Sequence, residues 1–283
     1  MKNILGDIRE KRLISFIVTC KGRLSHLQRS IPLLINQKES ETILVDYSCE
    51  DSCGDWLLRN YPSACVVRVL GQDSFSLSRA RNIGAASANG NILVFVDADH
   101  ITNIGLSSHI YEIMMGADWS SPADTSREAD ISGFLCVKKE VFDSIGGYDE
   151  AFKGWGGEDI DIMVRIRMSG AIFSPINTEF ITSIPHGDEI RQLNGNHPML
   201  NMGRRVSLQV SQLYMHIKID IMSMSGCLDL NTREKIYESC ARAIAHRGNR
   251  SNVCVSVGVP QKIMTKFSRR IKKNIIYDVD MGG

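Results

Sequence analysis

Hydrophobic and polar positions in the first hundred residues follow two alternating patterns. Short runs of apolar, often β-branched residues, typical of buried strands, occupy positions 13–19, 43–46, 65–70 and 92–97. Between these runs, apolar residues recur at helical spacing in 24–35, 56–60 and 80–88. This alternation predicts βαβ units that build an α/β fold with a mixed, mostly parallel sheet flanked by helices.

Polar residues stand at the carboxyl ends of three predicted strands. Thr19 and Asp46 end the first two strands, and Asp97 and Asp99 follow the run at 92–96. In open α/β sheets, ligands bind outside the carboxyl ends of the strands, where the loops leave toward the helices. We therefore expect these side chains to face one cleft, and the pattern favours a nucleotide pocket.

The pattern changes after about residue 203, where helical segments continue without clusters of catalytic residue types. The chain has 283 residues, of which 43% are hydrophobic, enough for one sizeable core. We predict a catalytic domain over 1–203, with a nucleotide-sugar half at about 1–100 and an acceptor half at about 101–203. A small helical appendage is expected over 204–283.

Charge and cysteine content narrow the class of protein. The 33 Lys and Arg residues against 32 Asp and Glu leave a net charge of +1, so no overall field favours a polyanion, and we expect no nucleic-acid partner. The eight cysteines include no paired Cys-x-x-Cys motifs and are interpreted as reduced thiols of a cytoplasmic protein. The apolar run at 13–18 is too short to span a membrane.

A basic segment near the end of the chain has two interpretations. Residues 262–273 contain six basic and no acidic residues, with apolar residues at helical spacing. Such a helix could lie peripherally on an anionic membrane, here the inner face of the plasma membrane. The alternative is a terminal helix packed on the catalytic domain with a solvated polar face. The oligomeric state is left open.

Asp97 and Asp99 form the first candidate constellation. They are one residue apart at the mouth of a buried strand, so in strand geometry their side chains share a face. Two neighbouring anions are costly unless a cation accompanies them, and a hard divalent cation that bridges to a diphosphate would serve. The alternative is that both are turn residues that end the strand.

The second constellation runs from Gly154 to Asp161. Trp155 lies beside two further glycines, Gly156 and Gly157, and three acids then open a helix: Glu158, Asp159 and Asp161. These acids could simply offset the positive end of the helix macrodipole. The tryptophan could instead stack on a sugar ring, while one carboxylate acts as general base toward an acceptor hydroxyl.

Both constellations resemble those of glycosyltransferases with the GT-A (Rossmann-like) fold. The stretch 77–86 together with the Asp-x-Asp resembles the donor-binding region of family 2-like members. The Gly-Trp-Gly-Gly-Glu-Asp-x-Asp sequence is similar to the acceptor motif of β-1,4-galactosyltransferases and chondroitin-type bacterial polymerases, which are inverting enzymes. Residues 20–27 resemble the Arg-x-x-His-Leu segment of the galactosyltransferases, and the resemblance covers roughly 13–187.

The resemblance implies a set of donor-side roles. Asp99 and His186 would hold a manganese ion, with magnesium as the alternative, and Asp97 would lie near the ribose and the water shell of the metal. The remaining donor-binding residues implied are Thr19, Arg23, Asp46 and Arg79. For Asp46, contact with a uracil ring and a role as a turn residue are both open. Either Arg79 or Arg81 pairs with a phosphate or with a structural carboxylate.

On the acceptor side, the resemblance makes Asp159 the general base and Glu158 a ligand of the acceptor, although either acid could be the base. Trp155 would be the stacking platform beside Gly156 and Gly157.

These roles together predict a metal-dependent, inverting glycosyltransferase. It would move a hexose or N-acetylhexosamine from a UDP-sugar to a hydroxyl of a glycan or lipid-linked sugar, in bacterial surface polysaccharide synthesis. One alternative is a haloacid-dehalogenase-type phosphatase, although that motif has Thr or Val where Ile101 stands and usually follows the first strand. The other alternative is a non-catalytic, glycan-binding family member.

Overall fold

The computed structural model describes residues 13–123, 131–154, 156–185, 203–248, 252–259 and 273–281. The chain divides into two compact units. Unit 1 comprises residues 1–148 and 162–194, and unit 2 comprises residues 149–161 and 195–283. The segment that carries the second constellation is therefore grouped with the C-terminal elements. The predicted division at residue 203 separates a catalytic domain from a helical appendage, and this assignment of roles stays a prediction.

Unit 1 is built on a six-stranded sheet with the order β3-β2-β1-β4-β7-β6. Strand β1 pairs in parallel with β2 and β4, and β2 pairs in parallel with β3. Strand β7 is antiparallel to both β4 and β6. The mixed, mostly parallel sheet predicted from the sequence is thus confirmed. The strands are β1 (Ile14–Cys20), β2 (Ser40–Tyr47), β3 (Cys65–Val69), β4 (Ile92–Asp97), β6 (Trp119–Ser120) and β7 (Leu135–Lys138).

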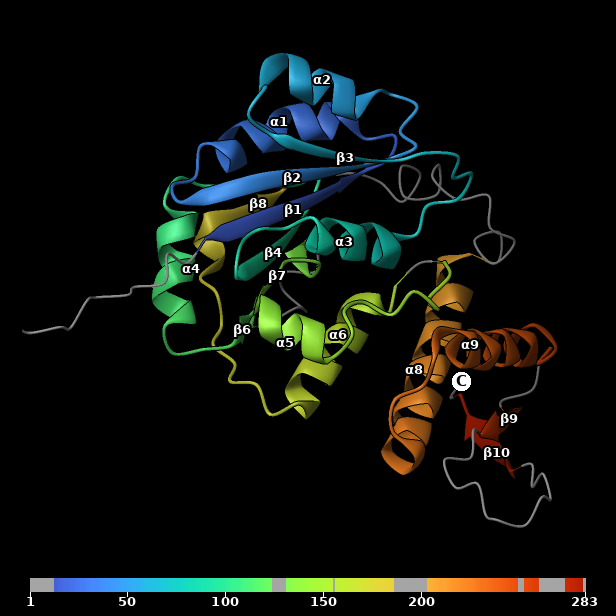
Figure 1. The fold of residues 1–283 in the computed structure, drawn as a ribbon. Helices are drawn as coiled ribbons and strands as arrows, with labels where there is room; N and C mark the ends of the chain where they lie inside the picture. Colours follow the sequence, from blue (N-terminus) through green and yellow to red (C-terminus); the bar gives the residue numbers. More distant parts are fainter. Residues whose placement is uncertain are drawn as a thin grey trace, which may run out of the picture. The chain divides into compact units, whose positions relative to one another are not determined.

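Helices cover both faces of this sheet (Figure 1). Helices α1 (Leu24–Ile35), α2 (Cys53–Asn60) and α4 (Leu106–Met114) share one core cluster with the sheet. The opposite face is covered by α3 (Leu77–Ala86), α5 (Lys139–Ser144) and the part of α6 (Glu158–Met168) that belongs to unit 1. The predicted strands and helices of the first hundred residues are all present.

Alternation along β1 shows how the sequence supports two covered faces. Phe16 and Val18 point into the core beneath α1 and α4, whereas Ile17 lies in the core on the α3 side. A strand buried on both faces needs apolar residues at consecutive positions, and every residue of β1 is buried. Helix α3 approaches this strand closely at Gly84, where a Cβ atom would lie 2.4 Å from Cγ2 of Ile17.

Unit 1 also contains a small second sheet of two strands, β5 and β8. Strand β5 (His100–Thr102) begins three residues after β4 ends and pairs antiparallel with β8 (Ile181–Ser183). The 3-10 helix η2 (Thr178–Phe180) leads into β8. This pairing brings residues 181–183 of the predicted acceptor half next to His100, which follows the Asp-x-Asp.

Unit 2 has its own core. Helices α8 (Arg204–Ser225) and α9 (Leu230–Ala245) pack with an antiparallel strand pair, β9 (Asn252–Val259) and β10 (Lys273–Asp280). Ala151 and Phe152, from the segment before the glycine-rich motif, belong to the same cluster. The C-terminal part thus contains the predicted helices and, in addition, a pair of strands.

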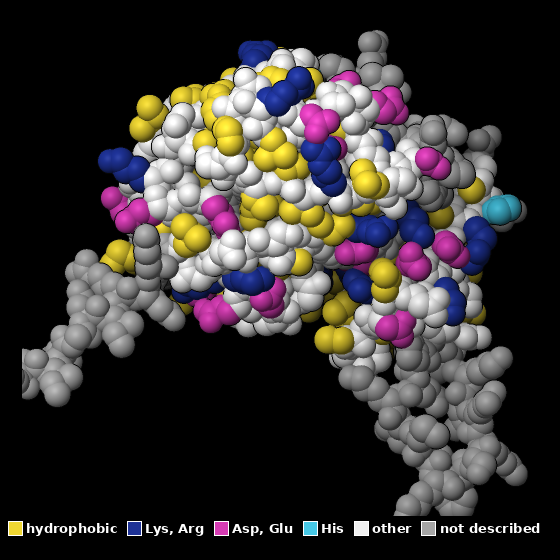
Figure 2. Space-filling view, turned by 45° about the horizontal axis from the view of Figure 1, so that its top comes forward, with side chains coloured by type: hydrophobic (Ala, Val, Ile, Leu, Met, Phe, Trp, Pro, Cys, Tyr) yellow, Lys and Arg dark blue, Asp and Glu magenta, His cyan; other side chains and the backbone are white. Residues whose placement is uncertain are grey.

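Two features of the surface bear on partners. On the face in Figure 2, positive and negative side chains of the described residues are interspersed, in keeping with the balanced composition. Among the described helices, none combines the length and the apolar character that crossing a bilayer requires. The predicted basic helix at 262–273 lies outside the described residues except for Lys273, with which β10 begins.

We predict that Gly84→Ala destabilises the protein by about 1–3 kcal/mol, because the added methyl group would overlap buried Ile17. Gly116→Ala is the matched control, since a Cβ atom there meets nothing within 4 Å. We expect the control to change stability by less than about 0.5 kcal/mol. Urea unfolding of both variants, followed by circular dichroism, checks this, and equal stability of the two would contradict the close packing of α3 on β1.

Candidate functional site

The register of the parallel strands brings the predicted donor residues to one edge of the sheet. Thr19 on β1 pairs with Asp97 on β4, and Cys20 pairs with Asp46 on β2. Parallel strands end at the same edge, so residues that are nearly eighty positions apart in the sequence become neighbours. The convergence of the strand ends that the sequence predicted is therefore present in unit 1.

Asp97 is held by a buried arginine of α3. The Arg81 Nη2 donates to Asp97 Oδ1 at 2.9 Å, and the guanidinium lies 4.9 Å from the centroid of the Tyr148 ring. Burial favours the neutral acid, but the Arg81 charge, with His100 and Arg23 nearby, outweighs this effect and lowers the pKa of Asp97 to about 2. Asp97 is thus a carboxylate at neutral pH.

Asp99 is buried and pairs with a second arginine. The Arg23 Nη1 lies 3.2 Å from Asp99 Oδ2. His100, also buried, accepts a hydrogen bond on Nδ1 from the Asp97 backbone N–H at 3.4 Å. Asp97, Asp99 and His100 each offer one ligand atom, and these atoms lie within 4.8 Å of one another. Two carboxylates and an imidazole form a donor set that suits a divalent cation such as Mn²⁺.

The chain approaches Asp99 again just before the predicted histidine ligand. The Ile184 backbone N–H donates to the Asp99 carbonyl oxygen at 2.8 Å, and β8 pairs with β5 immediately before this point. His186 itself lies outside the described residues, so its role as a metal ligand stays a prediction. The described part of this segment nevertheless runs beside Asp99.

Asp46 serves the loop that follows β2. Its Oδ1 accepts from the Cys49 N–H at 3.1 Å, and its Oδ2 accepts from the Gly54 N–H at 3.2 Å. The turn role considered for Asp46 is therefore present, because both oxygens fix the backbone of the loop. Contact with a nucleobase stays a prediction.

The two arginines of α3 have different surroundings. Arg81 is 1% exposed and pairs with the structural carboxylate described above. Arg79 is exposed, and its Nη1 lies 3.4 Å from Oε1 of Gln72. Of the two, Arg81 is thus the partner of Asp97, and binding of a donor phosphate by Arg79 stays a prediction.

In unit 2, the glycine-rich motif is closely packed against α8. Gly156 and Gly157 have φ values of +82° and +99°, in the region that favours glycine. A Cβ atom on Gly157 would lie 2.7 Å from Cβ of Ser211, and one on Gly156 would lie 2.9 Å from Cδ2 of Leu208. The two glycines therefore meet both a conformational and a steric requirement. Trp155 lies outside the described residues, and its stacking role stays a prediction.

The three acids in the first turn of α6 differ in exposure. Asp161 is fully buried, Glu158 is 9% exposed, and Asp159 is half-buried. All three lie where negative charge offsets the positive end of the helix macrodipole. Asp159 is the most accessible of them, which favours it over Glu158 as a group that meets a substrate.

Asp161 belongs to a buried ionic network. Lys218 of α8 is fully buried, and its Nζ donates to Asp161 Oδ1 and, at 2.7 Å, to Asp149 Oδ2. Arg233 of α9 donates to Asp149 Oδ1 at 2.6 Å, and the Tyr214 hydroxyl donates to Asp149 Oδ2 at 2.6 Å. Burial opposes ionisation of Asp149, but Lys218 and Arg233 outweigh it and lower the pKa of Asp149. Two anions and two cations thus compensate one another.

This network ties both ends of the candidate acceptor segment to the C-terminal helices. Asp149 precedes the glycine-rich motif and Asp161 follows it, and one ammonium group binds both. The hydroxyl of Tyr237 on α9 donates to the Lys153 carbonyl oxygen between them. The C-terminal helices therefore hold Asp149, Lys153 and Asp161, which lie on both sides of the glycine-rich motif.

The two constellations lie in different units. Asp97 and Asp99 belong to unit 1, whereas Glu158 and Asp159 belong to unit 2. Each has been described within its own unit, and their meeting across one cleft stays a prediction.

Sequence reasoning left two of the described residues without a role. His100 follows the Asp-x-Asp directly, and that adjacency is a signal that could have included it. Lys218 lies in α8, a helix whose first turn contains no acidic residue, and the sequence around Lys218 matches no catalytic or binding motif. Nothing in the local sequence marks it as a partner of acids that lie nearly sixty and seventy positions upstream.

We predict that Lys218→Met destabilises the protein by about 3–5 kcal/mol at neutral pH, because it removes the cation that two buried carboxylates share. The folded-state pKa of Asp149 is lowered, so its stabilising contribution is present above the ordinary carboxyl pKa and is lost as pH falls through the lowered value. The deficit of the variant should therefore shrink below about pH 4, where protonation of Asp149 removes a charge that Lys218 compensates.

Urea unfolding at pH 7 and pH 3.5, the latter about half a unit below the ordinary carboxyl value, measures both effects. Lys139→Met is the control, since Lys139 forms an exposed pair with Asp143 one helical turn away and should matter by about 0.5 kcal/mol or less. A deficit that is the same at both pH values would contradict the ionic role of Lys218.

Two family models match this chain over adjacent segments. Residues 15–117 match glycosyl transferase family 2. Residues 120–187 match a model described as the N-terminal domain of galactosyltransferase. The first match contains Asp46, Asp97 and Asp99, and the second contains the glycine-rich motif with Glu158 and Asp159.

The curated relatives have low sequence identity to this chain, and each is longer than the segment that aligns with it. The validoxylamine A glucosyltransferase of Streptomyces hygroscopicus subsp. jinggangensis is 21% identical, over 71% of this chain and 62% of that protein. Polypeptide N-acetylgalactosaminyltransferase 13 of Rattus norvegicus is 25% identical, over 52% of this chain and 36% of that protein. The chain thus spans less than two thirds of the length of either relative.

Solved structures share the fold. The mannosyltransferase PcManGT of Pyrobaculum calidifontis, in complex with GDP-Man and Mn²⁺, has a TM-score of 0.55 at 15% identity and covers 83% of this chain and 70% of its own. S. aureus TarS has a TM-score of 0.55 at 14% identity, with 84% and 73% covered. The chain therefore has the GT-A fold, its residues 15–117 are similar to family 2 glycosyltransferases, and its residues 120–187 are similar to a galactosyltransferase domain.

Proposed function

We propose that this protein is a metal-dependent, inverting glycosyltransferase that moves a hexose or N-acetylhexosamine from a UDP-sugar to an acceptor hydroxyl. The acceptor class we propose is a glycan or lipid-linked sugar of a bacterial surface polysaccharide. A cytoplasmic location beside the membrane would suit such an acceptor, with residues 262–273 as the contact. The observation that carries the proposal is the cluster of Asp97, Asp99 and His100 at the carboxyl edge of a GT-A sheet.

The donor set fits a divalent cation. Asp97 and Asp99 supply anionic oxygens, and His100 supplies a nitrogen within the same 4.8 Å cluster. Mn²⁺ accepts such a mixed set, and Mg²⁺ is the alternative. When bound, the cation would neutralise the diphosphate and stabilise the charge that develops on the departing nucleotide. Arg23 pairs with Asp99 and Arg81 pairs with Asp97, so the two arginines hold the two carboxylates in place.

Asp159 is the proposed general base. It is the accessible acid at the start of α6, and its neighbour Asp161 is already committed to Lys218. Asp159 would take the proton of the acceptor hydroxyl as that oxygen attacks the anomeric carbon and the bond to the diphosphate breaks. One displacement inverts the anomeric configuration. Glu158 would bind the acceptor, and Trp155 would stack on the acceptor's sugar ring.

We assign UDP as the nucleotide of the donor because of where Asp46 lies in the sheet. Asp46 is the penultimate residue of β2 and pairs with Cys20 of β1, at the edge where a nucleobase would lie. A competing assignment comes from PcManGT, whose structure contains GDP-Man. The base therefore has to be determined by competition between nucleotides.

A panel of nucleotide sugars tests the proposal. Purified protein with Mn²⁺ is incubated with UDP-glucose, UDP-galactose, their N-acetylated counterparts and GDP-mannose, and nucleotide release is measured with and without a chelator. We expect chelator-sensitive release of UDP from one UDP-sugar. Release of GDP alone would overturn the UDP assignment. Hydrolysis of an aryl phosphate would favour a phosphatase, and saturable glycan binding without any turnover would favour the binding protein.

We predict that Asp159→Asn lowers the rate of transfer by about 10²- to 10⁴-fold, the usual contribution of a general base. Affinity for UDP, measured by calorimetry with Mn²⁺, should stay nearly unchanged, because Asp159 is assigned to the acceptor. Asp143→Asn, an exposed acid on α5, is the control and should leave both quantities unchanged. If Glu158→Gln loses more activity than Asp159→Asn, Glu158 is the general base and Asp159 the acceptor ligand. If Asp159→Asn loses affinity for UDP, the assignment of Asp159 to the acceptor is wrong.

A further inference from the structure

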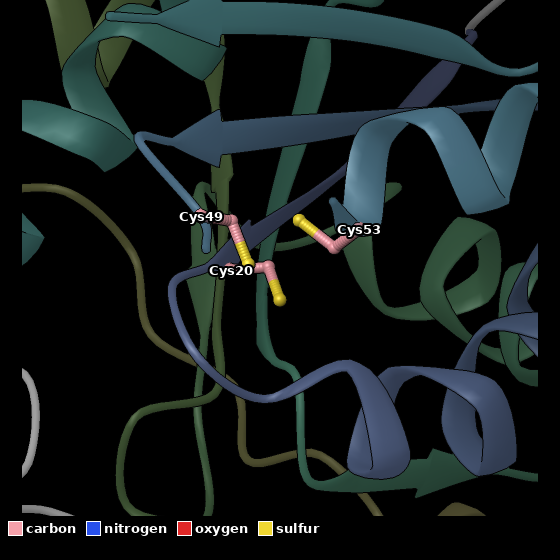
Figure 3. Close-up of side chains that lie close together, drawn as sticks. All are labelled: Cys20, Cys49 and Cys53. Atoms are coloured by element: carbon pink, nitrogen blue, oxygen red, sulfur yellow. The ribbon is translucent and has the colours of Figure 1, made fainter. Parts of the chain in front are cut away.

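Three thiols of unit 1 gather at one point near the edge of the sheet (Figure 3). Cys20 is the last residue of β1, Cys49 lies in the loop after β2, and Cys53 is the first residue of α2. Their sulfur atoms all lie within 4.8 Å of one another. Cys20 and Cys53 are 1% and 0% exposed, and Cys49 is half-buried. The sequence has no Cys-x-x-Cys pair here, because Cys49 and Cys53 are four positions apart and Cys20 belongs to an earlier strand.

The backbone around the cluster is arranged to stabilise a thiolate. The Gly22 N–H donates to Cys49 Sγ at 3.2 Å. Hydrogen bonds from the thiols of Cys20 and Cys53, and from the Cys53 backbone N–H, add to it and lower the pKa of Cys49. Asp46 fixes the same loop through the Cys49 N–H. Backbone N–H groups directed at sulfur are the usual outer-shell partners of metal-bound thiolates.

The number and kind of ligands select the class of cation. Three sulfur donors favour soft ions such as Zn²⁺ and Cu⁺ over the hard Mn²⁺ and Mg²⁺ expected at Asp97 and Asp99. Tetrahedral Zn–S bonds of about 2.3 Å place sulfur atoms roughly 3.8 Å apart. The three sulfur atoms lie within 4.8 Å of one another, so their largest separation is at most about 1 Å above that value. A disulfide, in contrast, would use two of the thiols and leave the third without a role.

We infer that Cys20, Cys49 and Cys53 bind one soft cation, Zn²⁺ or Cu⁺, through three thiolates. The S–H protons pass to solvent as the sulfur–metal bonds form. The bound ion would join the loop after β1, which carries Arg23, to the loop that Asp46 fixes. This inference stands independently of the proposed function, since it uses a different donor set.

The experiment uses the full-length, reduced protein under nitrogen. Co²⁺, a spectroscopic substitute for Zn²⁺, should produce a thiolate-to-cobalt charge-transfer band that saturates at one equivalent and disappears when Zn²⁺ is added. In parallel, alkylation of each cysteine is followed by mass spectrometry. One equivalent of Zn²⁺ or Cu⁺ should slow alkylation of Cys49 at least tenfold and leave the exposed Cys65 unaffected.

Variants separate this site from others. Cys49→Ser, chosen because Cys49 is only half-buried, should weaken Zn²⁺ binding at least tenfold and remove the charge-transfer band. Cys65→Ser is the matched control, and Asp99→Asn controls for the carboxylate cluster, so both should keep the band. Absence of the band in the wild type, or an unchanged band in Cys49→Ser, overturns the inference. An unchanged Cys49 alkylation rate with both Zn²⁺ and Cu⁺ also overturns it, even if the serine variant fails to fold.

Discussion

Parallel pairing of β1 with β2 and β4 is the constraint on which the candidate donor site depends. The backbone register alone sets Thr19 beside Asp97 and Cys20 beside Asp46. Side chains from three separate stretches of sequence therefore reach one edge of the sheet. Two arginines then orient the carboxylates there, Arg81 on Asp97 and Arg23 on Asp99. The hydrogen bonds of the sheet thus determine where these residues lie, and the ion pairs determine how the carboxylates of Asp97 and Asp99 are oriented.

A different interaction organises unit 2. The ammonium group of Lys218 binds Asp149 and Asp161, which bracket the glycine-rich segment, and Arg233 compensates the remaining charge. Such a network is costly to bury unless every member is paired, so it specifies one arrangement of the segment. Helices α8 and α9, which carry no catalytic-looking motif, thus determine the shape of the candidate acceptor loop.

Much of unit 1 could be predicted from the sequence because its signals are local. Apolar runs marked β1 to β4, and the polar residues at their ends marked the edge where they meet. The roles of Lys218 and the three thiols could not be predicted in this way, since each depends on contacts between residues far apart in the chain. Resemblance to known families supplied the acceptor motif, and the roles of Trp155 and His186 rest on that resemblance alone.

Asp46 has a consequence for the design of altered enzymes. Its two carboxylate oxygens accept hydrogen bonds from the backbone N–H groups of Cys49 and Gly54, so this buried side chain is part of the scaffold of the edge. In random mutagenesis aimed at new nucleotide preferences, most variants that replace Asp46 would be lost because the loop no longer folds. This holds whether or not Asp46 contacts a base. Within the described part of the chain, the side chain of Thr19 on the same edge fixes no loop backbone in this way, so substitutions there would disturb the scaffold less.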